Sequence, residues 1–127
     1  MYVSAFLWYI IIINSKDFCM PQFTFNNDDK KILTLLGFKI EVDTNSNQIA
    51  VYDYGYQHYI KLSKCFTTTP FTPQTVIHVD TINRQNYVVD NTVYESSKLT
   101  KTIAVKIKNL ILLLHKVELS NVVNMIV

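Results

Sequence analysis

The sequence contains only two glycines, Gly37 and Gly55, among its 127 residues. Phosphate-binding loops of the P-loop or dinucleotide-binding type need several closely spaced glycines, so the sequence excludes both. The two cysteines, Cys19 and Cys65, are too few for a disulfide framework and have no neighbours at metal-ligand spacing. They predict reduced or buried thiols in a reducing compartment, which we expect to be the cytoplasm.

Charge is also scarce, because charged residues make up 17% of the chain and hydrophobic residues 49%. This composition is typical of a globular protein of one domain and not of a disordered chain. The net charge of +2 is far below that of a dedicated nucleic-acid-binding protein. Asn, Ile, Lys and Tyr are abundant, as in AT-rich coding sequences, which predicts a virus, a phage or an AT-rich microbe as the source.

No apolar stretch is long enough to cross a membrane as a helix. The run over residues 5–13 is shorter than the roughly 20 residues of a membrane span, and no Lys or Arg precedes it as in a signal peptide. Four consecutive isoleucines favour a buried strand over the alternative of a signal peptide or membrane anchor. Alternatively, Met20 is the true start and residues 1–19 are an upstream extension of the reading frame. We therefore separate an apolar N-terminal segment, 1–19, from a single domain, 20–127.

The strongest pattern in the chain lies over residues 96–117. Apolar residues recur there at intervals of three and four, which predicts an amphipathic α-helix with one buried side: Leu99, Ile103, Ile107, Leu110, Leu114 and Val117. Ser96 or Ser97 is expected to cap its first turn. Four lysines, among them Lys98 and Lys108, lie off this stripe, so we expect the opposite side to be wet.

Apolar residues also interrupt the polar side of this helix, at Val105, Leu112 and Leu113. We therefore expect a second surface to cover the helix towards its end. The apolar residues 118–127 that follow are compatible with a final helical turn, an edge strand or a tail that binds a partner.

The rest of the domain has the pattern of one short helix and two β-hairpins. Residues 28–36 follow the good cap residues Asn26 and Asn27 and precede Gly37, which predicts a short helix. Alternating apolar and turn residues predict strands and loops as follows: strands over 38–43 and 48–54, extended chain over 56–62, a surface loop over 63–74, and strands over 75–80 and 86–89.

These elements predict an α+β fold, in which a mostly antiparallel sheet of two hairpins is packed by the long C-terminal helix. The alternative is a small β-barrel or sandwich capped by the same helix.

The most unusual stretch carries Tyr52, Tyr54, Tyr56 and His58 at every second position. In an extended chain these four side chains share one face. We expect the helix to cover the other face, so that the tyrosines form an exposed protein interface, most simply between the sheets of a homodimer. The alternatives are ordinary cross-strand packing and an aromatic platform on which nucleic-acid bases stack.

His78 and Asp80 are two residues apart on a predicted strand and would share a face. They are weak candidates for an acid–base pair or, together with His58 or Asp53, for a metal site. The sequence has no recognisable catalytic motif, so we assign no catalytic residue, metal or cofactor.

The sequence favours a non-enzymatic interaction protein that self-associates as a homo-oligomer. The contact would be made by the tyrosine-bearing hairpin or by the apolar C-terminal tail. The alternatives are a nucleic-acid-binding accessory protein that uses the same tyrosines, and a small enzyme with a His/Asp site. Another protein is a further conceivable partner, and no membrane association is expected.

Overall fold

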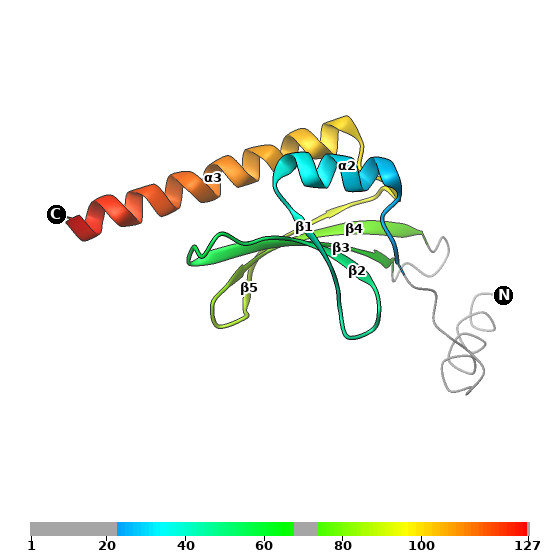
Figure 1. Cartoon of the computed structure of the whole chain (residues 1–127), viewed down its shortest axis with the longest axis horizontal. Coiled ribbons are helices and arrows are strands. Elements are labelled where there is room, and N and C mark those ends of the chain that lie inside the picture. The colour runs from blue at the N-terminus through cyan, green and yellow to red at the C-terminus, as the bar shows by residue number, and fades with distance from the viewer. Residues whose placement is uncertain (1–22, 68–73, 127) are drawn as a thin grey trace.

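The computed structural model of the chain describes residues 23–67 and 74–126 (Figure 1). A short helix is followed by five strands and a long helix. Their bounds are α2 Asn27–Leu36, β1 Lys39–Val42, β2 Gln48–Tyr52, β3 His58–Phe66, β4 Thr75–Asn83, β5 Val88–Tyr94 and α3 Lys101–Ile126. The expected α+β fold is confirmed, whereas the expected N-terminal segment 1–19 lies outside the described residues.

The five strands form one antiparallel sheet in the order in which they follow along the chain, β1-β2-β3-β4-β5. Each strand pairs with the one that follows it along the chain, as expected for hairpins. Three strands end later than the sequence indicated. β3 continues to Phe66, into the predicted loop, β4 continues to Asn83, past the predicted end at residue 80, and β5 continues to Tyr94, past the predicted end at residue 89.

Both helices lie over the same face of the sheet (Figure 1). The core between them is formed by alternate strand residues, among them Ala50, Ile60 and Leu62, each of which is fully buried. From α2 comes Leu33 and from α3 comes Ile107, which are 0% and 1% exposed. The opposite face of the sheet has no helix of the described residues over it.

Helix α2 begins and ends as its sequence predicts. The Asn26 side chain accepts a hydrogen bond from the N–H of Asp29 at 2.7 Å, which satisfies one of the free amides of the first turn. Gly37 ends the helix with φ of +97°, a left-handed conformation that glycine adopts without steric cost. A Cβ here would also lie 3.0 Å from the ring of Tyr52.

Asp29 is buried, and its carboxylate joins three elements. One oxygen accepts a hydrogen bond from Lys64 Nζ of β3 at 2.7 Å. The other accepts the N–H of Leu99, just before α3, at 2.9 Å. Because both charged side chains are at most 7% exposed, each would be costly to leave without the other.

Helix α3 starts later and ends later than predicted. Its first turn is capped by Thr100, whose Oγ1 accepts the N–H of Ile103 at 3.2 Å, whereas Ser96 hydrogen-bonds to Lys98 outside the helix. Residues 118–126 continue the helix, so its final turns reach beyond the end of the sheet (Figure 1).

Candidate functional site

The tyrosine-rich stretch is not one continuous strand. β2 ends at Tyr52 and β3 begins at His58, and residues 53–57 form the connection between them. The expectation that four alternate side chains share one open face is therefore wrong.

The assignment of the two faces of β2 is also wrong. In β1 and β2, Ile40 pairs with Ala50, so Ala50 and Tyr52 belong to the face that the helices cover. Ile49 and Val51 lie on the other face, where we expected the tyrosines. A shift of one residue in register exchanges the faces of every side chain in a strand, which is why the alternation in sequence did not decide between them.

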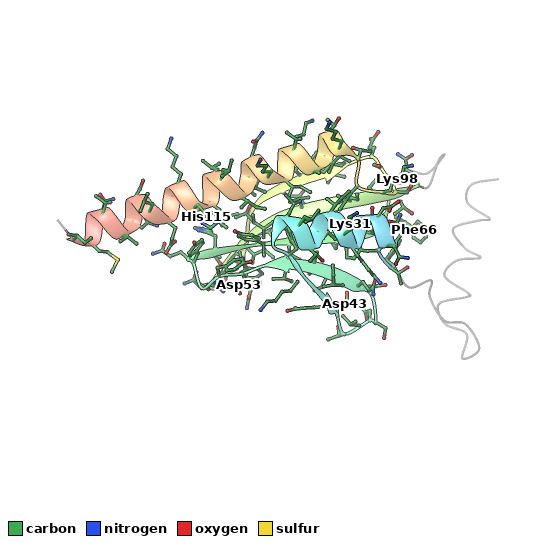
Figure 2. All side chains as sticks on the ribbon, turned by 45° about the horizontal axis from the view of Figure 1, so that its top comes forward. Lys31, Asp43, Asp53, Phe66, Lys98 and His115 are labelled. Carbon is green, nitrogen blue, oxygen red and sulfur yellow. The ribbon has the colours of Figure 1, made fainter. Side chains whose placement is uncertain are left out.

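Tyr52 and Tyr56 converge instead on a histidine of α3. This residue is His115, which is labelled in Figure 2. The Tyr52 hydroxyl lies 2.5 Å from Nε2 of His115, and the Tyr56 hydroxyl lies 2.8 Å from Nδ1. A neutral imidazole has one donor and one acceptor nitrogen, so one tyrosine donates to the ring and the other accepts from it. We call these three residues the Tyr–His cluster.

The Tyr–His cluster joins α3 to the sheet. Burial raises the pKa of Tyr52, and the nearby Tyr54 and Tyr56 raise it further. A raised pKa keeps the phenol protonated and able to take part in its hydrogen bond with His115. The cluster therefore fixes the middle of α3 to the β2–β3 connection.

The other two candidate residues of the tyrosine-rich stretch, Tyr54 and His58, lie in different surroundings. Tyr54 is 55% exposed and donates a hydrogen bond to the carbonyl of Gly37 at 3.0 Å. His58 is half-buried at the start of β3, on the face that Ile60 shares. With Tyr52 only 6% exposed, these residues do not form the open aromatic platform that base stacking requires.

The β2–β3 connection is held to the β4–β5 turn by an ion pair. Arg84 donates to both carboxylate oxygens of Asp53, at 3.0 and 2.7 Å, and also to the carbonyl of Tyr56 at 2.6 Å. The hydrogen bonds from Arg84, together with one from the N–H of Gly55, lower the pKa of Asp53 to about 2. Both side chains are well exposed, so the pair orders the loop more than it stabilises the fold.

His78 and Asp80 share the uncovered face of β4, as their spacing predicts. Asp80 is engaged with the side-chain amide of Asn91 on β5. His58 faces the other side of the sheet, so it does not join them. Among residues 23–67 and 74–126, no group of three or more His, Cys, Asp or Glu side chains is placed to hold a metal ion.

A shallow depression lies on the same uncovered face, over β1, β2 and β3. Its wall mixes charged and apolar side chains: Lys39, Glu41, Ile49, Val51, Asp53, Tyr59 and Lys61. Tyr59, and not Tyr52, Tyr54 or Tyr56, is the aromatic residue that lines this depression. Its ring lies 5.4 Å from the guanidinium carbon of Arg84.

The most distinctive surface of the described chain is the outer side of α3. Val105, Leu112, Leu119 and Ile126 are 48%, 56%, 66% and 79% exposed, and we call them the outer stripe. Val105, Leu112 and Leu113 were expected to interrupt the polar side of the helix, whereas the continuation at Leu119 and Ile126 was not predicted. The signal for it in the sequence is the constant spacing of seven residues. No helix of the described residues is long and apolar enough to cross a membrane.

Comparisons with protein-family models, with curated proteins and with solved structures find no match for this chain.

Proposed function

We propose that this chain is a non-enzymatic interaction protein that self-associates, and that α3 is its contact element. The observation that carries the proposal is the concentration of exposed apolar side chains on this helix. Nine of the seventeen large hydrophobic side chains that are exposed in the described residues belong to α3: Val105, Leu112, Leu113, Val117, Leu119, Val122, Val123, Met125 and Ile126.

Exposed apolar side chains are ordinary when they are scattered, but a contiguous set on one element is typical of a contact surface. On α3 the set includes both the outer stripe and the turns that project beyond the sheet (Figure 1). These residues lie outside the core, which the other side of the helix completes. Burial against another molecule would remove their apolar area from water.

The Tyr–His cluster supports the same proposal. It fixes His115 of α3 to the β2–β3 connection, and Glu118 accepts a hydrogen bond from the N–H of Gln57 at 3.4 Å. These bonds hold the helix in place near the point where it leaves the sheet. A contact element that is held rigidly loses less conformational entropy when it binds.

Sedimentation equilibrium of the full chain tests the proposal. We expect a mass above the 14.8 kDa of one chain that rises with protein concentration. Leu119→Glu places a charge on the outer stripe and should return the protein to a monomer. A chain that stays monomeric at all accessible concentrations would refute self-association.

Val89→Glu is the matched control, because Val89 is a similarly exposed apolar residue, 52%, on the edge strand β5. An exposed edge strand is itself able to pair with another chain. The control should leave the mass unchanged. If Val89→Glu dissociates the oligomer and Leu119→Glu does not, then β5 and not α3 is the contact element.

A further inference from the structure

We propose that two copies of this chain pair through their outer stripes, as an antiparallel two-stranded coiled coil of α3 helices. This inference depends on the proposed function, in which α3 is the contact element, and it specifies the occupant and the geometry of that contact. Its first support is the spacing of the exposed residues.

The outer stripe repeats every seven residues over three intervals. Four residues after each of its first three members comes another exposed position, occupied in turn by Asn109, Lys116 and Val123. The two sets alternate at intervals of four and three, which is the seam of a heptad repeat with the outer stripe at d and the second set at a. A helix that only packs on a sheet does not require this period on its outer side.

The seam is sterically free for a partner helix. Leu112 lies about 140° around the helix from the buried Ile107, since successive residues are about 100° apart. A second helix therefore approaches from the side opposite to the sheet. The last turns of α3 also project beyond the sheet, where nothing in the described residues obstructs an approach (Figures 1 and 2).

The charge distribution of α3 selects the antiparallel orientation. Lys101, Lys106 and Lys108 lie in its N-terminal half, where the helix dipole is positive, and its first turn has no acidic residue. The C-terminal half contains one lysine, Lys116, and the sole acidic residue of the helix, Glu118, so its side-chain charges cancel, and the last turn has no basic residue. An antiparallel copy places its negative end beside these lysines, whereas a parallel copy would place two lysine-rich ends together.

An antiparallel pair of identical helices is related by a two-fold axis, so the contact closes at a dimer. Two of the three a positions are polar, at Asn109 and Lys116. Polar residues at a reduce the stability of a coiled coil and restrict its register and oligomeric state. We therefore expect a reversible dimer rather than a permanent or larger assembly.

Leu112 and Leu113 provide a matched test of the seam, because they are neighbours of the same type and are 56% and 55% exposed. Leu112→Glu should raise the dimer dissociation constant at least about tenfold, whereas Leu113→Glu should raise it less than about threefold. Sedimentation velocity measures both constants, and circular dichroism verifies that the helix is kept. Equal losses for the two variants would refute the heptad seam.

Crosslinking tests the orientation, in a chain whose native thiols are removed by Cys19→Ser and Cys65→Ala. In the antiparallel dimer, position 105 lies beside position 126 of the other copy, while the two copies of position 105 are about 30 Å apart at about 1.5 Å per residue. A short bismaleimide should therefore link a mixture of the Val105→Cys and Ile126→Cys chains. It should not link either chain to itself.

The outcomes separate this inference from the proposed function. A monomeric wild-type chain refutes both. A wild-type dimer in which each cysteine variant links to itself refutes the antiparallel orientation. A wild-type dimer that gives no link at all refutes the helix pair and leaves self-association standing.

Discussion

The two sides of α3 have the same kinds of residue but opposite surroundings. On the inner side Ile103, Ile107, Ile111 and Leu114 are at most 8% exposed, whereas no residue of the outer stripe is less than 48% exposed. A helix with apolar residues on two sides is typical of one that is covered on both of them. The difference indicates that the described part of the domain buries the apolar side chains of only one side of α3.

The same contrast exists along the length of the helix. The N-terminal half lies on the sheet and is tied at its start to Asp29, through the N–H of Leu99. The C-terminal half leaves the sheet soon after His115, the last residue that the Tyr–His cluster holds. The variants below test this contrast between a part that stabilises the fold and a part that is free to make contacts.

The largest effect is expected at Asp29, which anchors the N-terminal half of α3. Asp29→Ala removes the partner of Lys64 and the acceptor for the Leu99 amide, and leaves a buried ammonium group unpaired. Breaking a buried ion pair from one side costs about 3–5 kcal/mol, so the free energy of unfolding should fall by that amount. Urea denaturation measures it.

Asp28→Ala is the control for this variant, because Asp28 is the exposed neighbour of Asp29 in the same turn of α2. It loses only a favourable charge near the positive end of the helix dipole, about 0.3–1 kcal/mol. Similar losses for the two variants would show that Asp29 acts as a helix-end charge and not as a buried anchor.

The inner side of α3 was largely predictable from sequence, because a 3.6-residue period reports one buried side without further information. Ile103, Ile107 and Leu114 are buried as predicted. Leu110 is only partly buried and Val117 is 44% exposed, because the helix leaves the sheet and Ile111 takes part in the core instead. The position at which a helix leaves its sheet depends on the tertiary structure, and the periodicity of the sequence does not predict it.

A direct comparison of the two sides of α3 comes next in size. Ile107→Ala creates a cavity in the core and should lower the free energy of unfolding by about 2–5 kcal/mol. Leu112→Ala removes a similar side chain from the outer stripe and should cost about 0.5 kcal/mol or less in dilute protein. Urea midpoints that coincide at low concentration would show that the helix is rotated about its axis.

Protein concentration sharpens this comparison. If the outer stripe forms a dimer, association stabilises the wild-type fold more as the concentration rises. The decrease in the free energy of unfolding caused by Leu112→Ala should therefore grow with protein concentration. The part of the decrease that the cavity at Ile107 causes is independent of concentration. A loss at Leu112 that does not change with concentration would contradict a role in self-association.

The faces of the sheet were less predictable than the helix. Strand alternation places Tyr52 and Val51 on opposite faces of the sheet. It does not say which of the two residues faces the helices, because that depends on the register of β1 against β2. The Tyr–His cluster could not be predicted from the sequence either. It joins Tyr52 and Tyr56 to His115, which is about sixty residues away and which only the tertiary structure brings near.

The smallest effect is expected at Asp53, whose ion pair with Arg84 holds the loop beneath the middle of α3. The pKa of Asp53 is lowered from 3.8 to about 2, first of all by the hydrogen bonds from Arg84. A lowered pKa means that the folded state binds this proton less well than the unfolded state does. The pair therefore stabilises the fold above pH 3.8, and its contribution disappears as the pH falls towards 2.

Asp53→Asn isolates this contribution, because other carboxylates titrate in both proteins alike. Since the two side chains of the ion pair are 39% and 40% exposed, solvent screens them, and the variant should lose about 0.5 kcal/mol or less at neutral pH. The difference in unfolding free energy between wild type and variant should shrink in high salt and disappear as the pH falls below about 2, the pKa of Asp53. A difference that persists unchanged below that pH would show that the charge of Asp53 does not help to hold α3 on the sheet. The loop would then be held by the remaining contacts of Arg84, with the carbonyl of Tyr56 and the ring of Tyr59.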